Sequence, residues 1–210
     1  MKTLTIFFLL INIQISHGQT LSKSTQKKLR QKLELMSIDD QKYRWELMLG
    51  ELDKHKLDSL KNLAKPEFWS RVKKVQLHEV GFNKSTYDSL WTLQNTLDSI
   101  NIEKFTKIIY DYGYPSLERT NSLVASVISI HLIGENKFAK FLPIFRNELK
   151  KGNMPPSEFA EWYDRNQLDQ NKKQLYGAYD IMNPCVENLE TTNIERAKIG
   201  LSAINENNCK

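Results

Sequence analysis

The stretch NSLVASVISIHLI at residues 121–133 is the most apolar segment that follows the first eighteen residues of the chain. Its apolar side chains cover nearly every face of a helix, whereas a helix at the surface of a protein carries them on one side only. Gly134 follows directly, and glycine is typical of the position that ends a helix. The stretch therefore predicts a helix in the middle of the fold, with other helices packed around it.

The segments on either side of this stretch also favour helices. The chain of 210 residues contains only 8 glycines and 6 prolines, so it has few of the breakers that separate β-strands. Residues 174–181 differ, because they are rich in β-type residues and carry no helical stripe. The sequence predicts a mainly α, single-domain helical bundle with a small β-hairpin-like appendage near the C-terminus, formed by 174–181 and 186–189.

Local signals predict where some of the helices begin. Ser37, with Asp40 three residues later, is typical of a capping box, so we expect a helix to begin there. Asn101 is expected to cap a further helix, and Pro143 to kink or restart the helix that contains it. The expected organisation is a polar helix or arm at 19–36, a mainly α domain at 37–201 and a tail at 202–210.

Residues 1–18 have the composition of a secretory signal peptide. Lys2 precedes an apolar run at 4–11, and Ser16 and Gly18 occupy positions −3 and −1 of a cleavage site. The run is too short for a membrane span, which needs about 20 largely apolar residues. We expect an exported protein, periplasmic or extracellular, with no membrane insertion after the signal is removed.

Cys185 and Cys209 are the only cysteines, and in an exported chain we expect them to form a disulfide. Two unpaired thiols are the alternative, because sequence spacing does not fix disulfide geometry. The net charge of +5 comes from 30 basic and 25 acidic residues that are spread along the chain. Without a concentrated basic block, a nucleic-acid partner is not expected.

His131 lies within the apolar stretch, where a buried imidazole needs a hydrogen-bond partner. Two interpretations stay open: a core histidine bonded to a backbone carbonyl, or a histidine that faces a cleft and can be a general base. Asp164 and Arg165 are further candidates, and adjacent helical residues point about 100° apart, so each needs another partner. We expect Glu161 to be the partner of Arg165, and a backbone amide of the following loop to be that of Asp164.

The motifs of several common enzyme classes do not occur in the sequence. It has no nucleotide-binding glycine pattern, no pairing of Cys or His with metal-ligand spacing, and no serine nucleophile elbow. The sequence therefore predicts no cofactor and no metal, and it does not specify a reaction.

A series of short motifs resembles an uncharacterised bacterial family known only as a domain of unknown function. The motifs are Asp98 and Asn101, Ile108 and Ile109, YGYPS at 112–116, His131, LP at 142–143, KG at 151–152, DR at 164–165, QLYG at 174–177, and Arg196, Gly200 and Leu201, with a weaker match at Asp40, Gln41 and Arg44. The resemblance covers residues 37–201 and implies no established activity, substrate or cofactor.

In similar proteins the polar motif positions are the histidine, the Asp-Arg pair and the Gln-x-Tyr-Gly segment. The resemblance therefore implies that His131, Asp164, Arg165 and Gln174 converge in space. This chain has Ile130 where similar proteins tend to have Gln, and Tyr179 in place of a Gln that follows Tyr-Gly-Thr. If the family site is catalytic, these departures imply altered or absent activity.

Three functions remain open at this point. The first is a cleft for a small ligand or peptide, or a structural network, built from the polar cluster around His131, Asp164, Arg165 and Gln174, with Tyr112 and Tyr176 as further ligand-binding candidates. The second is a hydrolase-like enzyme in which His131 is the general base, Asp164 orients it and Arg165 binds an anionic group. The third is a protein-interaction module that uses the exposed aromatic residues Trp45, Trp69 or Trp91.

Overall fold

The structure is a computed structural model, and it describes residues 18, 20–44, 47, 84–179 and 185–207. In these ranges the elements are α1 (Lys23–Gln41), α5 (Lys84–Tyr112), α6 (Leu117–Thr120), α7 (Val124–Ser129), the 3-10 helix η1 (Ile130–Leu132), α8 (Glu135–Lys150), α9 (Pro156–Asp169) and α10 (Leu189–Lys198). The prediction of a mainly α fold is confirmed. No helix within the described ranges combines the length and the apolar character that a membrane span requires.

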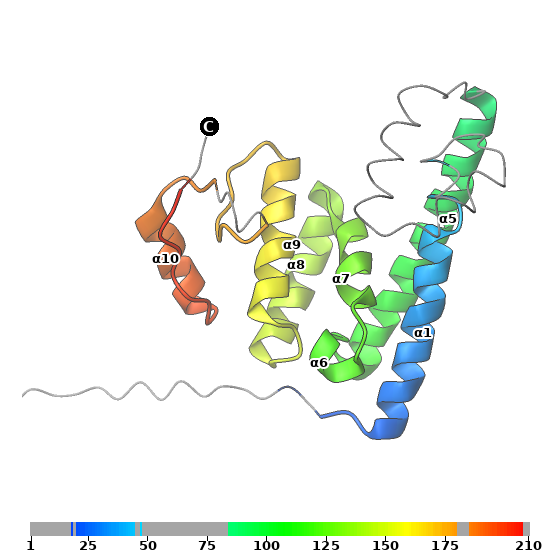
Figure 1. Cartoon of the computed structure of the whole chain (residues 1–210), viewed down its shortest axis with the longest axis horizontal. Helices are drawn as coiled ribbons and strands as arrows, with labels where there is room; N and C mark the ends of the chain where they lie inside the picture. Colours follow the sequence, from blue (N-terminus) through cyan, green and yellow to red (C-terminus); the bar gives the residue numbers. More distant parts are fainter. Residues whose placement is uncertain (1–17, 19, 45–46, 48–83, 180–184, 208–210) are drawn as a thin grey trace, which may run out of the picture.

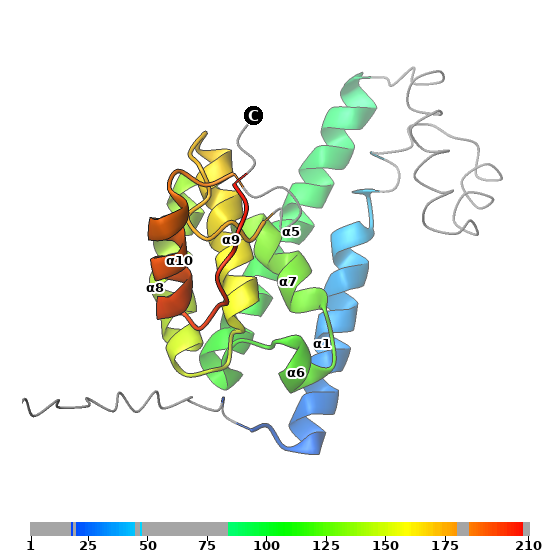
Figure 2. The same ribbon diagram turned by 60° about the vertical axis from the view of Figure 1, so that its left-hand side comes forward.

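The apolar stretch at 121–133 lies between two pairs of helices (Figure 1). It folds as α7 and η1, with α1 and α5 packed on one side and α8 on the other. Its Ile128 and Leu132 are fully buried, but Leu123 is 64% exposed. The central position is confirmed, whereas the stretch is not enclosed on every face. The helix α10 lies on the side of α8 and α9 that faces away from α7 (Figure 1 and Figure 2).

Aromatic rings join the two sides of the core. Phe105 of α5 packs edge-to-face against Tyr114, with ring centroids 5.9 Å apart. Tyr114 packs in the same way against Phe145 of α8 at 5.5 Å, and Phe145 against Trp162 of α9 at 4.6 Å. All four residues are buried. This chain of rings fixes α5 relative to α8 and α9.

The helix α1 differs from the expected arm and capped helix. It runs without interruption from Lys23 to Gln41, and its N-cap is Ser22, whose hydroxyl accepts a hydrogen bond from the Thr25 amide at 3.2 Å. Its buried side chains include Leu29, Leu33 and Met36, which recur at helical spacing. This narrow apolar stripe is sufficient to hold α1 in the fold because α5 and α7 both pack against it.

Two other expected boundaries also fall inside continuous helices. Asn101 lies within α5, where its buried amide donates to the carbonyl of Met36 at 2.9 Å and so joins α5 to α1. Pro143 lies within α8, which continues to Lys150. The helix therefore does not restart at Pro143, and the capping signal at Asn101 is overridden by tertiary packing.

The predicted β-hairpin is not formed by the described residues. Gln174 and Val186 make one isolated parallel bridge, in which the Gln174 amide donates to the Cys185 carbonyl at 3.1 Å. Residues 175–179 instead form a loop that is bound by the side chain of Asp164. The amides of Leu175, Tyr176 and Ala178 therefore find an acceptor without a partner strand. Residues 180–184 lie outside the described residues.

Candidate functional site

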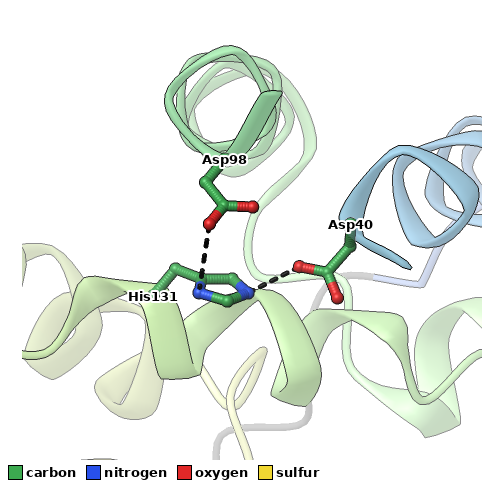
Figure 3. A group of neighbouring side chains, drawn as sticks. All are labelled: Asp40, Asp98 and His131. Carbon is green, nitrogen blue, oxygen red and sulfur yellow. Dashed lines mark hydrogen bonds and ion pairs between the residues drawn. The ribbon is translucent and has the colours of Figure 1, made fainter. Parts of the chain in front are cut away.

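The end of α1, the middle of α5 and the 3-10 helix η1 bring three side chains together (Figure 3). Asp40 follows the buried Met36 by four residues, so it shares the face of α1 that packs on the fold. Asp98 projects from α5 one turn before Asn101, which also faces α1. His131 comes from η1, and Figure 3 shows its ring between the two carboxylates.

The imidazole of His131 is bound by one carboxylate and approached by the other. Its Nε2 atom lies 2.5 Å from Oδ1 of Asp40, and its Nδ1 atom lies 4.0 Å from Oδ2 of Asp98. The side chain of Asp40 is only 2% exposed, whereas that of His131 is 20% exposed. Because a carboxylate only accepts hydrogen bonds, the short contact assigns the ring proton to Nε2 and leaves Nδ1 as an acceptor.

Arg44 lies one turn beyond Asp40 and contributes the positive charge of the cluster. Its Nη2 atom is 2.6 Å from Asp98 Oδ2, 3.6 Å from Asp40 Oδ1 and 3.4 Å from His131 Nε2. Because Nε2 carries a proton, the approach of Arg44 to the ring is not a hydrogen bond. Among the described residues, the other guanidinium nitrogens of Arg44 have no hydrogen-bond or ion-pair partner.

Gln94 joins the backbone at the end of α1 to the carboxylate of Asp98. Its buried amide nitrogen donates to Asp98 Oδ1 at 2.8 Å and to the backbone carbonyl of Asp40 at 2.9 Å. Its carbonyl oxygen accepts from the amide of Tyr43 at 3.0 Å. One side chain of α5 thus holds both the end of α1 and the carboxylate of Asp98.

The charges around Asp40 keep it ionised. Burial acts to raise the pKa of this carboxyl, but the hydrogen bond and charge of His131, the amide of Gln41 and the charge of Arg44 outweigh it. The pKa of Asp40 is therefore below its usual value. Two carboxylates and one guanidinium leave a charge of −1 while the imidazole is neutral, and protonation of the ring makes the group neutral.

A divalent metal is a competing occupant of this cluster. Asp40, Asp98 and His131 each offer one ligand atom, and these atoms all lie within 4.8 Å of one another. Carboxylate and imidazole together suit ions such as Zn²⁺ or Mn²⁺. However, Nη2 of Arg44 lies within 3.6 Å of all three residues. The guanidinium therefore occupies the space among the three ligands, so a metal would have to displace it.

The structure places Asp164 in a separate cluster. It is fully buried in α9, and its carboxylate accepts from the amides of Leu175 at 2.8 Å, Tyr176 at 3.0 Å and Ala178 at 2.8 Å. This confirms the expectation that a loop amide would be its partner. No hydrogen bond or ion pair joins Asp164 to His131, so Asp164 does not orient the imidazole.

Arg165 and Gln174 belong to the same loop cluster as Asp164. The Arg165 Nε atom lies 3.6 Å from Glu161 Oε1, which confirms the expected pair, and its guanidinium stands 4.5 Å from the ring centre of Tyr179. Gln174 is buried and accepts from the amide of Tyr179 at 3.0 Å. Asp164, Arg165 and Gln174 thus surround one loop, and none of them binds His131.

The other residues that the sequence suggested for ligand or protein binding make contacts within the fold wherever the structure describes them. Tyr176 is buried against Tyr163, with centroids 5.3 Å apart, and its carbonyl accepts from Arg196 at 2.6 Å. The carbonyl of Tyr112 accepts a hydrogen bond from Arg119 at 2.6 Å. The next residue, Gly113, has a φ of +79°, a backbone conformation that favours glycine. Of the three tryptophans considered, Trp91 packs edge-on against Tyr87 at 6.2 Å, and Trp45 and Trp69 lie outside the described residues.

Sequence reasoning missed the roles of Asp40, Arg44, Gln94 and Asp98. Asp40 and Arg44 stand four residues apart, a spacing that places both on one face of a helical turn. They also lie, with Asp98, among the short motifs from which the sequence predicted a family resemblance. Those two signals could have grouped them, but nothing local connects either residue to His131.

Comparison of the chain with family models, with curated proteins and with solved structures finds no match in any of the three.

Proposed function

We propose that the protein is a hydrolase-like enzyme in which His131 is the general base and Asp40 orients it. The observation that carries this proposal is the 2.5 Å contact between a partly exposed imidazole and a buried carboxylate. A buried acid of this kind fixes the tautomer of a catalytic histidine and stabilises the imidazolium that forms during the reaction. It also leaves the second ring nitrogen able to take a proton.

We place the nucleophile, a water molecule, between His131 and Asp98. Their Nδ1 and Oδ2 atoms are 4.0 Å apart, which is too long for a direct hydrogen bond. An oxygen atom about 2.8 Å from both atoms would form an angle of about 90° with them, close to the angle between the two hydrogens of water. A water molecule held there donates one hydrogen to Nδ1 and the other to Asp98.

The reaction then balances with these residues alone. The water gives a proton to Nδ1 while its oxygen forms a bond to the carbonyl carbon or phosphorus of the substrate. As the bond to the leaving group breaks, the leaving atom takes that proton from Nδ1, and the imidazole returns to its neutral form. The guanidinium nitrogens of Arg44 that do not contact Asp98 bind an anionic group of the substrate.

Hydrolysis assays with chromogenic probes test this proposal. We would use p-nitrophenyl acetate, p-nitrophenyl phosphate and bis(p-nitrophenyl) phosphate with the wild type, His131→Gln and a control, Asp111→Asn, which changes an exposed carboxylate. A general base contributes at least about 100-fold, so His131→Gln should lose that factor on the probe that the wild type cleaves. Equal rates for the wild type and His131→Gln on all three probes would contradict a hydrolytic role.

The tautomer of His131 gives a test that needs no substrate. Long-range nitrogen–proton NMR spectra distinguish a ring protonated at Nε2 from one protonated at Nδ1. We expect the neutral ring to carry its proton on Nε2, because Asp40 accepts it. A neutral ring protonated at Nδ1 would remove the proton acceptor from the nucleophile's side and overturn the assignment of roles.

We also infer that the chain is exported and that Cys185 and Cys209 are bridged. The side chain of Asn207 accepts from the amide of Val186 at 3.0 Å and donates to its carbonyl at 2.9 Å. These bonds hold the tail, two residues before Cys209, against the residue that follows Cys185. Cys209 and residues 1–17 themselves lie outside the described residues.

Mass spectrometry of the secreted product tests both parts of this inference. The intact mass should correspond to a chain that begins at Gln19. Iodoacetamide should label no cysteine before reduction and two after it. Two labelled cysteines in the native protein would exclude the bridge, and a chain that retains Met1 would exclude cleavage.

A further inference from the structure

A groove between α1 and α5 has no part in the chemistry of His131. Figures 1 and 2 show α1 beside the later part of α5, and the contacts between the two helices confirm it. The groove has a volume of about 300 Å³, at the lower end of the range in which proteins bind small molecules. Its size suits one short ligand.

The floor of the groove is apolar. Met36 and Ile108 line it and belong to the buried core, and Tyr112 lies beside them. Leu35 also lines the groove and is 61% exposed. Apolar surface of this kind favours an alkyl chain or an aromatic ring, because covering it releases water.

The rim of the groove is positively charged. Lys32, Lys104 and Lys107 line it, and Asp111 is the single acidic residue among the lining residues. Lys107 pairs with Asp111 at 3.0 Å and Lys104 with Asp39 at 3.2 Å, both in surface ion pairs, which are weak. Lys32 has no anionic partner among the described residues, so its ammonium group is available to an anion.

We propose that this groove binds a small amphiphilic carboxylate, with an alkyl or aryl part on Met36 and Ile108 and the carboxylate at Lys32. The apolar floor accounts for the hydrophobic part of the ligand, and the lysine rim selects an anion over a cation of the same shape. Because His131 and its partners do not line the groove, this binding and the proposed hydrolysis can fail independently of each other.

Calorimetric titration with two detergents of equal chain length tests the charge preference. The probes are decanoate and decyltrimethylammonium, each added to the full chain below the concentration at which micelles form. We expect decanoate to bind at least about tenfold more tightly, because the rim attracts one probe and repels the other. Equal affinity for the two probes, or no binding of decanoate, would overturn the proposal.

Matched surface variants locate the site. Lys32→Glu should weaken decanoate binding about tenfold, while Lys27→Glu, an exposed lysine of α1 outside the groove, should leave it unchanged. Leu35→Ser should weaken it about fivefold, while Ile38→Ser, at a side chain 65% exposed on the same helix, should not. All four side chains are at the surface, so folding is not at risk. Equal effects within either pair would exclude the groove.

Discussion

Asp40 and Asp164 are both buried, yet they differ in what binds them. Asp164 accepts from three backbone amides of one loop. Asp40 is bound by side chains, those of His131, Gln41 and Arg44. Backbone amides cannot lose their protons or turn away, whereas imidazole and guanidinium groups can exchange protons or move. The type of partner therefore distinguishes a carboxylate that holds a loop from one that can orient a reactive ring.

The pKa values of the two carboxyls are also shifted in opposite directions from the ordinary value of aspartate. Burial raises the pKa of Asp164, and its three amide bonds and the charge of Arg196 do not fully offset this effect. For Asp40, burial is outweighed by His131, Gln41 and Arg44, and the pKa falls. Two buried carboxyls thus respond to pH in opposite ways, because the groups that bind the carboxylate outweigh the effect of burial only at Asp40.

The largest expected effect is on the free energy of unfolding, through the loop that Asp164 binds. Asp164→Ala leaves three amides without their acceptor, and each buried orphan costs about 1–3 kcal/mol, so we expect a loss of about 4 kcal/mol in the free energy of unfolding. Urea denaturation measures it. The control is Asp169→Ala, an exposed carboxylate at the end of the same helix, for which about 0.5 kcal/mol or less is expected. A loss for Asp164→Ala as small as that of the control would show that the loop does not depend on its carboxylate.

A smaller effect on stability is expected at Asp40. Asp40→Asn keeps an oxygen that can accept from His131, so it should lower the free energy of unfolding by about 1 kcal/mol. Hydrolysis should nevertheless fall at least about 100-fold, because the imidazolium loses its counter-charge. A variant that is fully active but strongly destabilised would make Asp40 a structural residue like Asp164.

The pH dependence of stability should have opposite signs for the two residues. The unfolded aspartate titrates near about pH 3.9, and folded Asp40 titrates below that value, so its contribution is complete above about pH 4 and is lost as pH falls. Folded Asp164 titrates above it, so stability should decline as pH rises from about 4. Urea denaturation of the wild type, Asp40→Asn and Asp164→Asn between pH 3 and 6 measures both. If Asp40→Asn and Asp164→Asn changed the pH dependence of the unfolding free energy in the same direction, the two residues would not differ as described.

The smallest expected effect is that of added metal. Because Arg44 lies among the three ligand atoms, 1 mM Zn²⁺ should shift the Tm of the wild type by less than about 1 °C. Arg44→Met removes the guanidinium and should give a larger shift, which a second change, His131→Gln, should abolish. Stabilisation of the wild type by several degrees would instead identify Asp40, Asp98 and His131 as a metal centre.

Local patterns predicted the features that depend on near neighbours. The apolar stretch at 121–133 predicted the central position, and Asp164 was expected to bind the loop that follows its own helix. His131 is different, because its partner Asp40 is 91 residues away in the sequence. That contact exists because α1 packs against α7, which continues into η1, and no spacing in the sequence encodes it. The capping signals at Ser37 and Asn101 failed for the same reason, since distant packing keeps both helices continuous.

The amide of Gln94 ties the backbone carbonyl of Asp40 to the carboxylate of Asp98. Glutamate at this position would repel Asp98, and asparagine would be too short to reach both α1 and Asp98 from α5. Either change would release the Asp98 carboxylate, whose Oδ2 bounds the 4.0 Å gap in which the nucleophile is proposed to bind. Position 94 should therefore tolerate substitution as poorly as His131 itself, although Gln94 contacts neither the ring nor the proposed nucleophile.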